Sequence, residues 1–82
     1  MAEHSIVSPL PGTFYRRSAP DAPNYIEVGE AVECGAVIGL IEVMKQFSEL
    51  HADKTGTLVA FHVEDGDPIE PGQLLAVIAS DE

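Results

Sequence analysis

The chain has 82 residues, of which 14 are acidic and 4 are Lys or Arg, so its formal net charge is −10 at pH 7. This length allows one small domain, which buries only about 60% of the surface of its unfolded chain, and it excludes a large enclosed active site. The acidic balance argues against nucleic acids and anionic membranes as partners, because both need clustered Lys and Arg. It fits a protein partner with basic patches, and equally a charge that only keeps a small protein soluble.

Short runs of β-branched and aromatic residues, separated by Pro-Gly, Asp-Gly and Gly-Asp-Pro turn signals, predict an all-β sandwich. The predicted strands are Thr13–Arg16, Tyr25–Val28, Val37–Val43, Gln46–Ala52, Gly56–Val63 and Leu74–Ile78. Between the first two strands the sequence has no apolar alternation, and its prolines Pro20 and Pro23 fix φ. We therefore expect a stiff, protruding loop there.

An internal repeat supports this reading. Val28–Ile41 aligns with Asp65–Ile78 at an offset of 37 residues, and each copy has a turn, a short strand, a second turn and a longer strand. Ser8–Phe14 aligns with Ala52–Leu58 at an offset of 44 residues. The two offsets differ by seven, which places about seven extra residues in the first half, at the stiff loop.

The segment around Lys45 fits two conformations. Its apolar residues match helical spacing, and these are Leu40, Val43, Met44, Phe47 and Leu50. The repeat favours strands instead, because its counterpart Leu74–Ile78 is too short for a helix, so Lys45 is predicted at a hairpin tip. Two-residue hairpin turns favour Asn-Gly or Asp-Gly, in which both residues accept positive φ, and Met44-Lys45 suits this geometry poorly. Such a local mismatch indicates a functional site.

Five short motifs carry a family resemblance. They are Ser8-Pro9-x-x-Gly12-Thr13-Phe14-Tyr15-Arg16, Pro20-Asp21-Ala22, Ile26-Glu27-Val28-Gly29, Glu42-x-Met44-Lys45 and Ala52-Asp53-Lys54-x-Gly56-Thr57. With these motifs the chain, from Ile6 to about Ala79, resembles the biotin/lipoyl attachment family, and specifically its biotin carboxyl carrier branch of multisubunit acetyl-CoA carboxylases. The resemblance implies a flattened β-sandwich (barrel-sandwich hybrid) of two quasi-symmetric four-stranded halves. Residues 1–82 then form a single domain.

The same resemblance implies a site. Lys45 would receive covalent biotin, and Val43, Met44 and Gln46 would be the flanking residues that a biotin protein ligase reads. A protruding thumb at about residues 17–23 would contact the cofactor. Its candidate contact residues are Arg17, Ala19, Pro20 and Asp21.

The implied function is that of a non-catalytic carrier, with neither catalytic residues nor a metal site. Biotin on Lys45 would shuttle a carboxyl group from a biotin carboxylase to a carboxyltransferase, for fatty acid synthesis in an acetyl-CoA carboxylase. Three alternatives stay open: a carrier for a different biotin-dependent carboxylase, a lipoyl carrier, and an unmodified interaction domain. Met44 favours biotin over lipoate, because most lipoyl domains have Asp at that position.

The chain departs from the family pattern at four places. The residue before Met44 is usually Ala but is Val43 here, and Gln46 replaces a bulky apolar residue after Lys45. In the thumb, Arg17 stands where Thr is common, and Pro23 replaces a Lys. These departures affect the residues that a ligase and the biotin ring are expected to contact.

The remaining residues are best read as structural. His4, His51 and His62 lack the spacing of metal ligands. Phe47 and Leu50 are expected in the core rather than on a docking surface.

The sequence also suggests a compartment. Cys34 is the only cysteine, so no internal disulfide forms and a reducing compartment is the default. The sequence shows neither a basic, apolar leader nor an apolar run long enough to span a bilayer. We therefore expect a cytoplasmic protein, or one inside an organelle after removal of a targeting segment.

Overall fold

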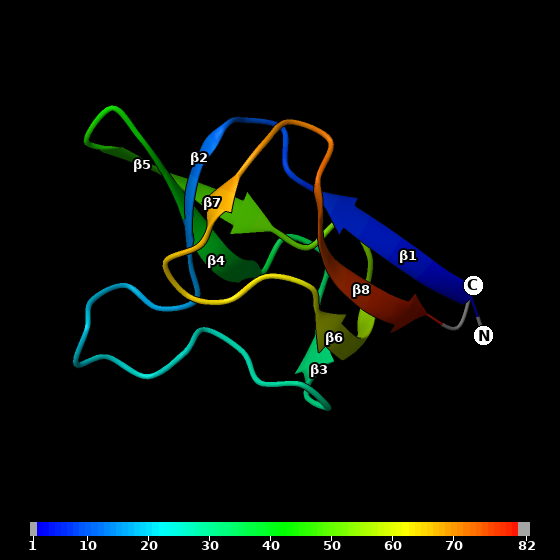
Figure 1. The fold of residues 1–82 in the computed structure, drawn as a ribbon. Coiled ribbons are helices and arrows are strands. Elements are labelled where there is room, and N and C mark those ends of the chain that lie inside the picture. The colour runs from blue at the N-terminus through cyan, green and yellow to red at the C-terminus, as the bar shows by residue number, and fades with distance from the viewer. Residues whose placement is uncertain (1, 81–82) are drawn as a thin grey trace.

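Eight β-strands arranged in two sheets make up the computed structural model, which describes residues 2–80 (Figure 1). The strands are β1 (Ala2–Val7), β2 (Gly12–Tyr15), β3 (Ala31–Val32), β4 (Val37–Val43), β5 (Gln46–His51), β6 (Gly56–Phe61), β7 (Pro68–Ile69) and β8 (Leu74–Ser80). One sheet has the order β1-β8-β6-β3 and the other the order β5-β4-β2-β7. All strand pairs are antiparallel. The predicted all-β sandwich of two four-stranded halves is confirmed.

The internal repeat relates the two sheets to each other. An offset of 37 residues carries β3 and β4 onto β7 and β8, and an offset of 44 carries β1 and β2 onto β5 and β6. The same exchange turns the strand order of the first sheet into that of the second. Each sheet therefore contains strands from both halves of the chain, which ties the two halves into one core.

Alternating side chains of both sheets form this core. Its buried cluster consists of Ile6, Phe14, Ile26, Val32, Ile38, Ile41, Leu50, Ala52, Leu58, Val63, Ile69, Leu75, Ala76 and Ile78. Because successive side chains of a strand point to opposite faces, each strand also presents residues on the outer face of its sheet. The attachment and docking surfaces described below are built from these outer positions.

The β4–β5 hairpin and the loop between β2 and β3 project from the same side of the sandwich, away from the chain ends (Figure 1). An isolated β-bridge between Arg17 and Asn24 closes the base of this loop. Its tip contains a turn in which the Ala22 N–H donates to the Ala19 carbonyl at 3.0 Å. The predicted protruding loop is therefore present, and residues 17–23 are called the thumb below.

The predicted strand Tyr25–Val28 is wrong. Side chains take up two of its backbone groups: the Arg16 guanidinium donates to the Ile26 carbonyl at 3.3 Å, and the Glu30 carboxylate accepts from the Glu27 N–H at 2.7 Å. Ile26 is buried in the core. The apolar character of this segment thus reflects a side chain that anchors the returning loop rather than a strand.

The other predicted strands are confirmed, with ends that shift by at most two residues. The sequence pattern did not predict β1, because only Ile6 among its residues is both apolar and buried. The repeat contained the signal, since an offset of 44 residues places β1 on β5.

Candidate functional site

Lys45 lies at the tip of the β4–β5 hairpin. Val43 and Gln46 form the last pair of the ladder, so Met44 and Lys45 make a two-residue turn. Their φ angles are 52° and 67°, and they are the non-glycine residues with positive φ among residues 2–80. This backbone matches the hairpin turn in which both central residues adopt positive φ. The predicted hairpin tip is confirmed and the helical alternative is wrong.

The residues around Lys45 differ in their accessibility. Met44 is 91% exposed, and Lys45 and Gln46 are also exposed. Val43 packs against the core with part of its side chain. A protein that reads this turn therefore meets Met44, Lys45 and Gln46, while Val43 is mainly part of the scaffold.

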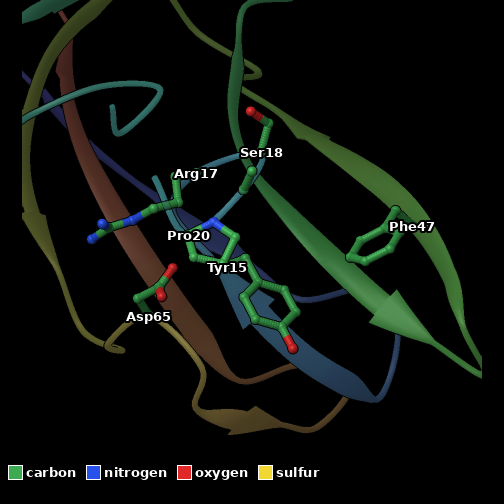
Figure 2. Close-up of a pocket in the computed structure, with 7 residues that line it drawn as sticks. Tyr15, Arg17, Ser18, Pro20, Phe47 and Asp65 are labelled. Atoms are coloured by element: carbon green, nitrogen blue, oxygen red, sulfur yellow. The ribbon is translucent and has the colours of Figure 1, made fainter. Parts of the chain in front are cut away.

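A cleft of about 400 Å³ lies between the thumb and the outer face of the β5-β4-β2-β7 sheet. Its lining residues are Tyr15, Arg17, Ser18, Ala19, Pro20, Phe47 and Asp65 (Figure 2). The sequence had pointed to Arg17, Ala19 and Pro20 as thumb contacts, and all three line the cleft. Asp21 is exposed and is not among these lining residues.

Two aromatic rings form one wall of the cleft. The Tyr15 and Phe47 ring centroids lie 6.1 Å apart at an interplanar angle of 53°. Tyr15 in β2 and Phe47 in β5 flank β4 between them, and the Tyr15 hydroxyl donates to Glu42 Oε1 of β4 at 3.0 Å. This hydrogen bond, followed by partial desolvation and the negative charges of Glu42 and Asp65, raises the pKa of Tyr15 above its ordinary value.

The core position expected for Phe47 is therefore wrong, because Phe47 is 59% exposed and contributes to the cleft. Leu50 is buried, as expected. The two residues are three positions apart, so they face opposite sides of a strand even though they would share one face of a helix. Once Lys45 is assigned to a hairpin, Phe47 and Leu50 fall on the same strand, and one of the two must lie on the outer face of the sheet.

Arg17 and Asp65 provide charged groups on the side of the cleft opposite Phe47 (Figure 2). The Nε atom of Arg17 is buried and has no hydrogen-bond partner among the described residues. Asp65 Oδ1 accepts the backbone N–H of Arg16 at 2.7 Å. The cleft thus combines an aromatic wall with a cationic donor and an anionic acceptor.

Arg16 serves the thumb rather than the cleft. Its guanidinium lies 4.5 Å from the Phe61 ring centroid and forms an ion pair with Glu27 at 3.2 Å. The Tyr25 N–H donates to the Arg16 carbonyl at 2.9 Å. These contacts fix the base of the thumb directly before Arg17, which is among the residues that line the cleft.

Within residues 2–80, no three His, Cys, Asp or Glu side chains are grouped so that they could hold a metal ion. The same residues contain no helix long and apolar enough to cross a membrane. These residues instead place an exposed lysine on a constrained turn, two residues before Phe47 in the aromatic wall of a cleft. The sequence had missed four lining residues of this cleft, namely Tyr15, Ser18, Phe47 and Asp65.

Comparison with known proteins agrees with this geometry. A family model described as "Biotin-requiring enzyme", of the biotin/lipoyl type, matches residues 4–78. The chain is 37% identical over 78 residues to the biotin carboxyl carrier protein of acetyl-CoA carboxylase from Haemophilus influenzae, covering 95% of this chain and 50% of that protein. It is 42% identical over 72 residues to the chloroplastic biotin carboxyl carrier protein of acetyl-CoA carboxylase 2 from Arabidopsis thaliana, covering 88% of this chain and 28% of that protein.

Solved structures show the same fold within larger carboxylases. The urea carboxylase of Kluyveromyces lactis matches with a TM-score of 0.78 and 30% identity, over 96% of this chain and 6% of that one. A single-chain, multi-domain long-chain acyl-CoA carboxylase matches with a TM-score of 0.77 and 25% identity, over 98% of this chain and 7% of that one. The chain spans half or less of the length of these relatives. From the family match over most of its residues, the chain belongs to the biotin/lipoyl attachment family.

Proposed function

We propose that this chain is a biotin carboxyl carrier domain whose Lys45 is covalently biotinylated. The observation that carries the proposal is the exposed Lys45 on a turn with two positive φ angles, next to a cleft formed by the thumb. The curated relatives named biotin carboxyl carrier protein of acetyl-CoA carboxylase support this assignment. Residues 1–82 act as a single domain, with the thumb at residues 17–23 as its insertion.

The lining of the cleft fits a biotin head group. The ureido part of biotin has a carbonyl acceptor between two N–H donors, and the Arg17 guanidinium and Asp65 carboxylate offer the matching donor and acceptor. The fused rings are largely apolar and suit the walls formed by Tyr15, Phe47 and Pro20. Lys45 lies in the turn directly before β5, two residues from Phe47 and so at most about 7 Å of chain away, and a tether on Lys45 reaches the cleft.

Attachment depends on the accessibility of Lys45 and of the residues beside it. Its amine attacks the acyl carbon of biotinyl-adenylate made by a biotin protein ligase, an amide bond forms, and the bond to AMP breaks. The lysine charge is lost as the proton leaves. Met44 and Gln46, which are exposed beside it, are the residues that the ligase contacts.

Bound biotin supplies a ring nitrogen that carries a carboxyl group between a biotin carboxylase and a carboxyltransferase. The chain contributes tethering and shielding rather than catalysis of its own. The tether raises the effective concentration of the group at each partner. The thumb residues Ala19 and Pro20 help to exclude water from the cleft. We assign this cycle to an acetyl-CoA carboxylase in fatty acid synthesis, acting in the cytoplasm.

A second candidate is a carrier for a different biotin-dependent carboxylase. The fold matches to a urea carboxylase and to a long-chain acyl-CoA carboxylase favour it, because the same scaffold serves other acceptors in those proteins. Purified biotin carboxylase and carboxyltransferase, tested with acetyl-CoA, urea and longer acyl-CoA substrates, distinguish the two candidates. The preferred acceptor identifies the parent carboxylase.

Intact-mass analysis after co-expression with a biotin ligase tests the attachment itself. We expect one biotin adduct that maps to Lys45, disappears in Lys45→Arg and remains in Lys54→Arg, the control at the other lysine. A lipoyl adduct would reassign the chain to lipoate transfer. An unshifted mass with active ligase and ample biotin would contradict the carrier function.

A further inference from the structure

The outer face of the β1-β8-β6-β3 sheet carries almost no charge. Two rows of directly paired residues cross it: Glu3, Ala79 and Thr57 form one, and Ser5, Val77 and Ala60 form the other. Two exposed valines extend this surface, Val7 at 48% and Val59 at 39%. We call the surface of Val7, Val59, Ala60, Val77 and Ala79 the apolar face.

The internal repeat provides a comparison for this face. The offsets that relate the two sheets place Glu42 at the position of Ala79, His51 at that of Val7 and Tyr15 at that of Val59. At these three positions, polar or charged groups of the β5-β4-β2-β7 sheet, called the thumb-bearing sheet below because the thumb covers part of it, are replaced by small apolar ones.

The burial of equivalent residues on the outer faces also differs between the two sheets. Leu40 lies on the thumb-bearing sheet and is 8% exposed, whereas its counterpart Val77 is only partly buried. Because Glu42 and His51 occupy the positions equivalent to Ala79 and Val7, the same scaffold tolerates titratable side chains there, and the fold alone does not require an apolar face. Contiguous exposed apolar surface is typical of interaction sites.

Charges around the apolar face indicate the kind of partner. None of the four basic residues lies in β1, β8, β6 or β3. Acidic residues stand at both edges of the sheet, with Glu3 in β1 and Glu30 and Glu33 on either side of β3, and all three are exposed. These edges are three strand spacings apart, about 14 Å.

A second copy of the chain is a poor occupant, because each copy has a net charge of −10 and would repel the other. A partner with Lys or Arg on both sides of a small apolar centre complements the face.

We propose that the apolar face is the docking surface for a catalytic partner with such a basic-rimmed apolar patch. The proposal rests on the proposed carrier function, which supplies partners of this kind. The cleft lies on the outer face of the other sheet, so a partner seated on the apolar face leaves the thumb and Lys45 uncovered. A small interface also gives the weak, transient binding that a carrier needs to move between two partners.

Binding of the biotinylated chain to purified biotin carboxylase and carboxyltransferase from the same source tests the proposal. Val7→Lys and Val59→Lys each place a charge on the apolar face, and we expect them to weaken binding to at least one partner by about tenfold or more. His51→Lys is the matched control, because His51 occupies the position equivalent to Val7 on the other sheet. It should leave the affinity unchanged. Wild-type binding should weaken as salt rises, because of the acidic edges.

Equal weakening by His51→Lys, or no effect of Val7→Lys and Val59→Lys, overturns the proposal. So does a wild-type dimer in sedimentation that Val59→Lys dissociates, since the occupant is then a second copy. Intact mass separates this inference from the carrier function: both face variants should still gain biotin on Lys45. A wild-type chain that binds partners through the face but never gains biotin would contradict the carrier function and leave the docking surface in place.

Discussion

The backbone carbonyl of Glu42 lies directly over Gly12, where a Cβ atom would overlap it. The repeat contains the same relationship a second time, since a Cβ on Gly56 would overlap the carbonyl of Ala79. The missing side chains let β2 approach β4 and β6 approach β8 closely, so both sheets contain the same close contact.

Gly12→Ala and Gly56→Ala should therefore each destabilise the fold by about 3 kcal/mol, because backbone has to move to make room. Chemical denaturation measures the loss. Gly72→Ala is the control: Gly72 has positive φ, 83°, as Gly12 does, but nothing lies within 4 Å of its added Cβ, so only the backbone cost of about 1 kcal/mol applies. Losses at Gly12 and Gly56 that are no larger than the loss at Gly72 would show that the close carbonyl contacts do not decide the effect.

Met44 is expected to destabilise the turn that presents Lys45. A side chain other than Gly, Asn or Asp is disfavoured at its φ of 52°. Met44→Asn should therefore raise the free energy of unfolding by about 1 kcal/mol, since Asn is the preferred first residue of this turn. Met44→Val should lower it by a similar amount, because β-branched residues fit positive φ worst. Thermal unfolding of the three proteins measures the order; a destabilised Met44→Asn would contradict it.

Much of the scaffold was predictable because the repeat contains the same turns twice. Glycines and prolines at matching offsets define where each strand ends, and the repeat excluded a helix at Lys45 that local periodicity allowed. The functional role of the turn was predictable for a different reason. Met44 and Lys45 are poorly suited to a two-residue hairpin turn, and this mismatch indicated a functional site. A duplicated pattern thus constrains strands that no single window would assign.

The cleft was less predictable, because it depends on contacts between distant segments. Phe47 was expected in the core from its residue type, yet its partner is Tyr15, more than thirty positions earlier. Asp65 belongs to a turn signal, and only the fold places it beside Arg17. The burial preference of a residue type states how often its side chain is buried. It does not predict which loop will lie over a given strand.

Tyr15 should ionise at higher pH than an ordinary tyrosine. The chain has two tyrosines, so in Tyr25→Phe an ultraviolet titration follows Tyr15 alone. We expect its pKa to lie above 10.0 and to fall back in Glu42→Gln, because Glu42 provides the leading cause of the shift. The folded state holds the Tyr15 hydroxyl proton more tightly than the unfolded state does. The stabilisation that results is therefore fully present below the pKa of Tyr15 in the unfolded chain, and it is lost as pH rises through the pKa of Tyr15 in the folded chain. An unchanged titration in Glu42→Gln would assign the shift to another group.

Arg16 should control the mobility of the thumb. Its guanidinium binds Glu27 and the Ile26 carbonyl and lies over the Phe61 ring, so one side chain ties the returning segment to β6. Lysine keeps the charge but loses the planar fork and the ring contact. In Arg16→Lys we expect hydrogen exchange of the Tyr25 amide, which donates to the Arg16 carbonyl, to rise by about tenfold.

Arg17→Lys is the matched control for this change. Arg17 is the adjacent residue, with one main-chain bridge to Asn24 and a side chain that lines the cleft, so its replacement should leave the exchange of the Tyr25 amide unaltered. Amides of the core strand β8 should keep their protection in both variants, which separates local opening of the thumb from global unfolding. If β8 exchanges faster together with Tyr25 in Arg16→Lys, Arg16 stabilises the whole sandwich, and the thumb is not an independently opening segment.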